Sequence, residues 1–193
     1  MAKTAEKSEN WCKYAKEYGP IKCGSIDGTD TDPHDRGIIR AINSTYKPNA
    51  KVVGDPHYTI FIGRLHIKTN EDKLKRKFEK FGKIRRCRVV RDLVTGMSKC
   101  YGFIEFERSS AAREAVRKCI REFIDDCEIV VEHEFERTLK NWKPRRLGGG
   151  FGGRKESGQL RFGGRTRPFQ RPLDVKVSTD IKEVFRQKKY QKF

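Results

Sequence analysis

Hydrophobic and polar positions follow a regular pattern only in the middle of the chain. Four stretches alternate apolar and polar residues or carry a short apolar core, which is typical of β-strands, and two stretches have the apolar spacing of an amphipathic helix. The predicted strands are residues 58–63, 84–91, 99–106 and 128–133, and the predicted helices are residues 69–81 and 109–119. This βαββαβ order predicts an α+β domain of the ferredoxin-like type, with a four-stranded antiparallel sheet.

Signals at the helix ends support this interpretation. Thr69 with Asp72 resembles a capping box, and Gly82 is a C-terminal stop signal. Ser109 or Ser110 is the expected N-cap of the second helix. Both helices are expected to cover the same face of the sheet, which leaves the other face open.

The third predicted strand has an unusual outer face. At the two-residue period of a strand, Tyr101 and Phe103 share one face with Lys99 and Glu105, and the opposite face carries residues suited to a core. The topology puts this strand beside the first one, so Phe61 is expected next to the two rings. Aromatic rings beside cations on an open sheet suit the bases and phosphates of RNA. The alternative is that one of the flanking arms folds back and covers the rings.

The first half of the N-terminal arm contains a candidate helix and an acidic turn. Aromatic residues at helical spacing predict a short helix over residues 11–18, which Gly19-Pro20 would end. Residues 24–33 are rich in turn formers and aspartate. They lack the ligand order of an EF-hand, so they are interpreted as a turn and not as a calcium site.

A second short helix is predicted over residues 34–43. Asp32-Pro33 would cap it, and Ile38, Ile39 and Ile42 would form its inner face. A helix of this length is not stable alone in water. We therefore expect it to pack on the main domain or on a partner.

Composition makes a polyanion the expected partner. The formal net charge is +18, and residues 134–193 hold 17 basic against 6 acidic side chains. Nothing at the C-terminal end resembles a basic amphipathic helix with a bulky apolar face, so nucleic acid is favoured over a membrane surface. No stretch approaches the roughly 18 consecutive apolar residues of a membrane span, and the start lacks the apolar region of a signal peptide.

The residues with reactive or metal-binding side chains form no recognisable site. The six cysteines include no Cys-x-x-Cys pair and only four histidines accompany them, so we expect free thiols and no zinc. Neither a nucleophile–base pattern nor a phosphate loop is present. The sequence thus predicts no enzyme, no cofactor and no small-molecule substrate.

Two motifs resemble those of the RNA-recognition-motif family. Residues 99–106, KCYGFIEF, are similar to the family octamer and depart from it at Cys100, where glycine is usual. Residues 60–65, IFIGRL, are similar to the companion hexamer, with Arg64 where asparagine is common. Segments in both arms are similar to those of the RNA-recognition-motif proteins in the major and minor spliceosomal particles. These segments are residues 24–36, 136–150 and 156–165.

The resemblance implies an RNA-bound structural subunit in the nucleus. Its RNA would be a small nuclear RNA stem-loop, in the minor-spliceosome particle that recognises the five-prime splice site. Its protein partners would be other proteins of that particle. The alternatives are a free splicing regulator that binds many pre-mRNAs, and a sheet that binds a peptide.

The predicted organisation is an N-terminal arm with short helices (1–56), an RNA recognition motif (57–133), a basic helical extension (134–147) and a Gly/Arg-rich arm (148–193). Stacking on bases is expected from Phe61, Tyr101 and Phe103. Contacts with phosphates or base edges are expected from Lys99, Arg64, Arg86 and Arg88. In the extension the candidates are Trp142, Arg145 and Arg146, although Trp142 would equally suit docking on the domain.

Overall fold

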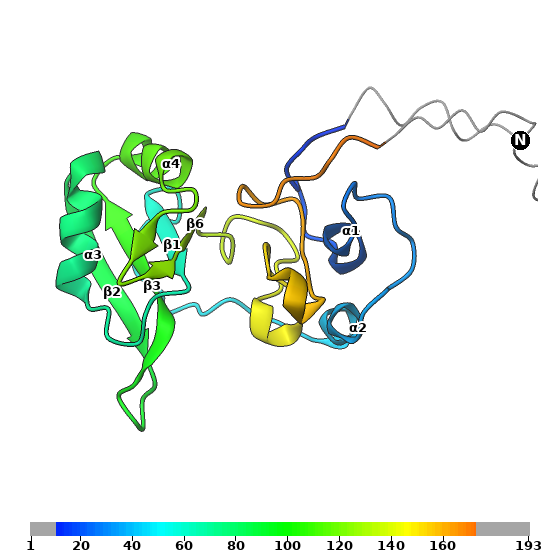
Figure 1. Cartoon of the computed structure of the whole chain (residues 1–193), viewed down its shortest axis with the longest axis horizontal. Coiled ribbons are helices and arrows are strands. Elements are labelled where there is room, and N and C mark those ends of the chain that lie inside the picture. The colour runs from blue at the N-terminus through cyan, green and yellow to red at the C-terminus, as the bar shows by residue number, and fades with distance from the viewer. Residues whose placement is uncertain (1–10, 173–193) are drawn as a thin grey trace, which may run out of the picture.

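The computed structural model describes residues 11–172 and contains the predicted four-stranded antiparallel sheet. The strand order is β2-β3-β1-β6, so β1 and β3 lie at the centre as expected. The strands are β1 (Thr59–Gly63), β2 (Ile84–Arg91), β3 (Ser98–Phe106) and β6 (Val130–His133). Helices α3 (Glu71–Phe78) and α4 (Ser109–Lys118) cover one face (Figure 1). We call this unit the sheet domain.

The core of the sheet domain lies between the sheet and these two helices. Leu74 and Phe78 of α3 are fully buried, because they stand four residues apart on one side of the helix. They belong to one cluster with Ile60, Ile62 and Ile104, which alternate with outward residues along β1 and β3. No helix within residues 11–172 covers the other face of the sheet (Figure 1).

The helix caps differ from the sequence prediction. Asn70, not Thr69, is the N-cap of α3, and its side chain accepts a hydrogen bond from the Lys73 amide. The Thr69 hydroxyl instead donates to Asp125. Helix α4 follows Arg108, which makes no side-chain cap, so neither serine caps it.

The last predicted strand is shorter than expected, because a small hairpin precedes it. The hairpin is formed by β4 (Phe123–Ile124) and β5 (Cys127–Glu128). Asp125 and Asp126 both have positive φ, as a two-residue turn of this hand requires. A short 3-10 turn, η1 (Glu79–Phe81), also extends α3 up to Gly82.

The N-terminal arm folds differently from the prediction. Residues 11–18 form bends, and Gly19-Pro20 begins a helix instead of ending one: α1 spans Pro20–Gly24. Proline suits the first position of a helix, where its missing N–H is not needed. Helix α2 (Arg36–Asn43) is capped by Asp35, not by Asp32, and Asp35 accepts from the Ile38 amide at 2.8 Å.

Only part of the expected inner face of α2 is buried. Ile38 and Ala41 are fully buried, while Ile39 and Ile42 are almost half exposed. The expectation for Ile39 and Ile42 was wrong, because the helix contacts its neighbours through the narrow stripe formed by Gly37, Ile38 and Ala41.

The described parts of the two arms fold against each other beside the sheet domain (Figure 1). Backbone hydrogen bonds run from Ala15 N to Gly163 O and from Phe162 N to Cys23 O, at 2.9 and 2.6 Å. We call this unit, residues 11–46 and 135–172, the arm lobe. The expected helical extension over 134–147 contains no α-helix; it consists of turns and one 3-10 turn, η2 (Arg145–Leu147).

A second 3-10 turn, η3 (Lys155–Ser157), lies further along the arm lobe. Over residues 11–172, no helix combines the length and the apolar character that crossing a membrane requires.

Candidate nucleic-acid interface

Three aromatic rings meet on the open face of the sheet, at its centre. Phe61 of β1 lies directly opposite Phe103 of β3, and Tyr101 lies opposite Gly63. The ring centroids of Phe61 are 5.9 Å from Tyr101 and 5.7 Å from Phe103. All three side chains are partly exposed. We call them the aromatic triad; their π-faces are a suitable platform for unpaired bases.

Gly102 allows β3 to hold this arrangement. A Cβ atom added at Gly102 would stand 2.6 Å from the Arg88 carbonyl oxygen on β2. The close approach of the two strands therefore requires a residue without a side chain between Tyr101 and Phe103.

Cations border the triad on the β2 side. Arg88 lies opposite Phe103 in the ladder, is exposed and makes no ion pair with a described residue. The Arg86 Nε is 3.7 Å from a carboxylate oxygen of Glu105, and the Lys99 Nζ is 3.5 Å from one of Asp92. About half of each cationic side chain is exposed and therefore accessible to phosphates, although Glu105, the partner of Arg86, is itself only 4% exposed.

Arg64 connects the sheet domain with the arm lobe. It follows β1 directly and has a positive φ of 61°. Its Nη2 donates to the Gly153 carbonyl oxygen at 3.3 Å. Arg64, which was predicted to contact a phosphate or a base edge, thus uses one of its N–H groups for a hydrogen bond within the protein.

The three candidates of the extension have different surroundings. Trp142 packs in an aromatic cluster with Tyr18, Phe135 and Phe151, at centroid distances of 5.0 to 5.4 Å. Trp142 therefore packs inside the arm lobe, and not on the sheet domain as the docking interpretation expected. The cluster is further closed by the Tyr18 hydroxyl, which donates to the Gly150 carbonyl oxygen at 3.0 Å.

Arg145 and Arg146 differ in exposure: the Arg145 side chain is partly buried, and the Arg146 side chain is exposed. Arg145 donates from Nη2 to the Gln159 carbonyl oxygen at 2.6 Å, and its Nη1 is buried without a hydrogen-bond partner among the described residues. Burial, with the charge of Arg161 nearby, lowers the pKa of Arg145. Arg146 is exposed and lies over the Tyr46 ring at 5.3 Å. Only Arg146 is freely accessible to an RNA backbone.

Sequence reasoning missed a carboxylate beside the triad. Glu132 of β6 lies opposite Phe61 in the ladder and is only 4% exposed. It accepts hydrogen bonds from the Arg165 and Thr166 amides and from the Thr166 hydroxyl, at 3.2, 2.9 and 2.8 Å. Burial raises the pKa of Glu132, and these hydrogen bonds oppose the increase. The C-terminal arm thus folds back over β6, but all three rings of the triad stay partly exposed and are not covered in the way that the alternative expected.

The alternation of buried and open-face residues along β6 could have placed Glu132 on the open face of the sheet. Val131 is buried in the core, so its neighbour Glu132 had to face the open side. The identity of its partners could not be read from the same pattern.

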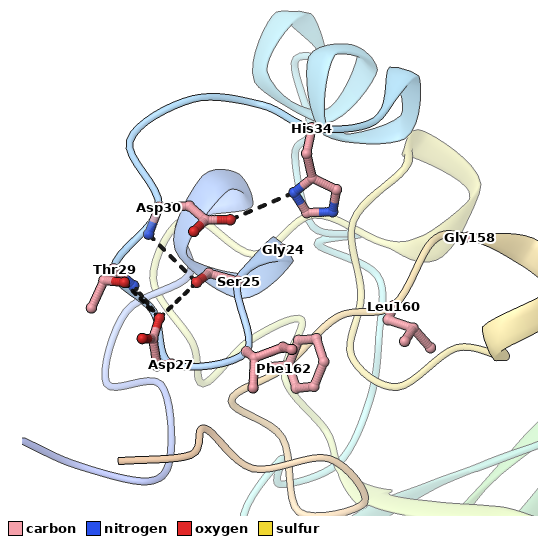
Figure 2. Close-up of a pocket in the computed structure, with 10 residues that line it drawn as sticks. Gly24, Ser25, Asp27, Thr29, Asp30, His34, Gly158, Leu160 and Phe162 are labelled. Atoms are coloured by element: carbon pink, nitrogen blue, oxygen red, sulfur yellow. Dashed lines mark hydrogen bonds and ion pairs between the residues drawn. The ribbon is translucent and has the colours of Figure 1, made fainter. Parts of the chain in front are cut away.

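A separate cavity of about 500 Å³ lies in the arm lobe (Figure 2). Asp27 and Asp30 line it, and Asp30 is 3.7 Å from the His34 ring. Its floor includes Leu160 and Phe162. The two carboxylates repel phosphates, so this cavity does not suit a nucleic acid. No group of three or more metal-ligating side chains occurs within residues 11–172.

Comparisons with known proteins agree with this geometry. Residues 60–130 match the family model of the RNA recognition motif. The human "U11/U12 small nuclear ribonucleoprotein 35 kDa protein" is 58% identical over 168 residues, which cover 87% of this chain and 68% of the relative. The Danio rerio protein of the same name is 54% identical over 165 residues, covering 86% and 79%.

A more distant relative has a related name. The Arabidopsis thaliana "U1 small nuclear ribonucleoprotein 70 kDa" is 36% identical over 138 residues, covering 69% of this chain and 32% of the relative. The class is therefore that of RNA-binding proteins built on one RNA recognition motif, which are not enzymes. Within this class, the chain belongs to the family of the U11/U12 small nuclear ribonucleoprotein 35 kDa proteins.

Proposed function

We propose that the chain is an RNA-binding subunit of the U11/U12 small nuclear ribonucleoprotein. In this proposal the aromatic triad stacks on unpaired bases in the loop of a small nuclear RNA stem-loop. Arg86, Arg88 and Lys99 contact phosphates beside those bases. The particle recognises the five-prime splice site of minor-class introns through its RNA, and the protein contributes to its architecture in the nucleus.

One observation carries the proposal: three aromatic rings lie together on a sheet face that no described helix covers, and three exposed cations border them. Each stacked base contributes roughly 1–3 kcal/mol. Rings on two central strands can hold successive bases of one strand, whereas a continuous duplex would shield its bases from them. The names of the relatives support a fixed particle RNA as the ligand.

The proposal includes protein partners from the same particle. The arm lobe supports this part, because its surface exposes Ile39 and Ile42 side by side on α2. Arg146, and Arg64 in a rearranged contact, would continue the basic surface from the sheet toward the arm lobe. Trp142 and Arg145 would act indirectly, by shaping the arm lobe.

The test compares one stem-loop of the particle RNA with an unstructured strand of equal length and composition, in a filter-binding assay. The full chain should prefer the stem-loop, because a preformed loop presents its bases without an ordering cost. The reverse preference would favour a free pre-mRNA regulator.

The same assay tests the triad directly. Phe61→Ala combined with Phe103→Ala should weaken binding at least tenfold, since about 1.4 kcal/mol is one factor of ten and two stacking rings are lost. The matched control is Phe123→Ala, because Phe123 is 60% exposed on the separate β4–β5 hairpin. Equal affinity of the double variant and the control would contradict stacking and would favour a peptide-binding sheet.

A further inference from the structure

Glu132 puts a carboxylate on the sheet face that we propose to bind RNA, where an acidic side chain is unexpected. It stands on the open face, and residues directly opposite in an antiparallel pair have Cβ atoms about 5 Å apart, which puts it next to Phe61. A free carboxylate at this place would repel phosphates. The structure accounts for its presence, because the carboxylate is covered by the chain itself and accepts three hydrogen bonds from Arg165 and Thr166.

The segment that covers Glu132 is a closed loop. The Gly163 amide donates to the Arg167 carbonyl oxygen at 2.9 Å, and the Gly163 carbonyl accepts from the Ala15 amide. We call residues 163–167 the clasp loop. Its ends are fixed in the arm lobe, and Glu132 is the contact that fixes its middle against the sheet.

The clasp loop carries Arg165, whose nearby charge helps to lower the pKa of the Glu132 carboxylate against the larger effect of burial. Arg165 makes no ion pair with a described carboxylate, and its guanidinium lies over the Tyr14 ring at 5.2 Å. The same charge helps to lower the pKa of His133, for which burial is the larger cause. His133 is the next residue of β6, so Arg165 stands at the border of the sheet.

We propose that Glu132 is a positioning residue of the RNA surface. Its carboxylate fixes the backbone of Arg165 and Thr166 on β6, and the Tyr14 ring then directs the Arg165 guanidinium, which contacts a phosphate of the RNA on the triad. This inference rests on the proposed function and adds a phosphate contact opposite the β2 cations. The bound strand would thus meet cations on both sides of the aromatic rings.

The sign of one substitution separates this role from simple electrostatics. By charge alone, Glu132→Ala removes a negative group from an RNA-binding face and should strengthen binding. By the positioning role it should weaken binding by about fivefold, as expected for the loss of one net hydrogen-bonded contact. The matched control is Glu128→Ala, because Glu128 is exposed on β5 and pairs with no described cation; this variant should bind equally well or slightly better.

A double-mutant cycle tests the route through Arg165. Arg165→Ala should weaken binding by the same factor as Glu132→Ala, and the double variant should bind no more weakly than either single variant. Each should reduce the slope of log affinity against log salt by about 0.7–0.9, the value for one phosphate. Independent, additive losses would overturn the proposal.

Thr166→Val is a milder variant that tests the same contact if Glu132→Ala fails to fold. It removes one of the three hydrogen bonds and keeps both the charge of Glu132 and the branched shape of the side chain. It should weaken binding in the same direction, with an unchanged circular-dichroism spectrum. If Thr166→Val and Glu132→Ala both bind with unaltered affinity, the positioning role is overturned. If the triad variants still lose binding in the same assay, the proposed function stands. If the wild-type chain itself does not bind the stem-loop, the proposed function fails instead.

Discussion

Cys100 has a backbone conformation that suits glycine better than cysteine. Its φ is 60°, in the left-handed region, at a register shift of the β2–β3 ladder between Val89 and Arg91. A contact outside the strand holds this backbone conformation: the Cys100 carbonyl oxygen accepts a hydrogen bond from the Leu65 amide at 2.9 Å. The RNA-recognition-motif octamer has glycine here. Cys100 is therefore strained at a position where the octamer has glycine.

Cys100→Gly should stabilise the protein by about 0.5–1 kcal/mol, since the strain of roughly 1–2 kcal/mol exceeds the added chain entropy of glycine. The measurement is the free energy of unfolding in urea. Cys119→Gly is the control: Cys119 is fully buried and has φ −92°, so its loss should only destabilise. A lower unfolding free energy for Cys100→Gly would contradict the strain.

At the scale of elements, Glu71 ties the first turn of α3 to β2. Its carboxylate accepts from Arg91 Nη1 and Nη2 at 2.6 and 3.0 Å, and from the Val89 amide at 3.0 Å. The hydrogen bonds from Arg91, with the one from Val89, lower the pKa of Glu71 from 4.5 to about 2. Because the folded-state value lies below the unfolded one, this contribution is present above pH 4.5 and is lost as the pH falls toward 2.

The predicted result is a pH-dependent difference between Glu71→Gln and the wild type. The variant should be less stable at pH 6, and the two unfolding free energies should converge between pH 4.5 and 2, in urea titrations at each pH. Glu128→Gln is a suitable control, since Glu128 is exposed on β5 and pairs with no described cation. A difference that does not shrink between pH 4.5 and pH 2 would contradict the linkage.

The sequence predicted those elements whose pattern is local. Residues such as Leu74 and Phe78 face the core at helical period, and Phe61, Tyr101 and Phe103 share a face at strand period. Those periods reveal elements and faces without knowledge of distant partners.

The features that the sequence did not predict depend on contacts between residues far apart in the chain. Tyr18 was assigned to a local helix, but its ring packs against Trp142 and Phe151, more than a hundred residues away. Glu132 depends on Arg165 and Thr166 in the same way. Long-range pairs of this kind leave no periodic signal, so neither the arm lobe nor the clasp loop could be derived from the sequence.

At the scale of the whole molecule, one buried ion pair joins the two arms. Arg161 is 0% exposed and donates to both carboxylate oxygens of Asp35, at 2.7 and 3.0 Å, and to the Gly148 carbonyl oxygen. Asp35 also caps α2. Burial opposes the ionisation of Asp35, but the hydrogen bonds from Arg161 and Ile38 lower its pKa overall. The pair therefore connects α2 with the C-terminal arm.

Asp35→Ala should destabilise the arm lobe by about 3–5 kcal/mol, because it leaves the Arg161 charge buried without a partner. Trp11 and Trp142, the two tryptophans of the chain, both lie in the arm lobe, whereas most of the regular secondary structure lies in the sheet domain. Tryptophan fluorescence should thus report unfolding at a lower urea concentration than far-ultraviolet circular dichroism. The two transitions should lie closer together in the wild type.

Two further variants assign this loss to the ion pair. Asp35→Asn retains an oxygen for the Ile38 amide, so it separates the cap, worth about 1 kcal/mol, from the charge. Asp35→Ala combined with Arg161→Met removes both charges and should be more stable than Asp35→Ala alone, since no buried charge remains unpaired. A double variant as unstable as Asp35→Ala would mean that the arms are joined through packing and the cap, and not through the pair. Recovery would instead establish Arg161 as the cation that makes Asp35 necessary.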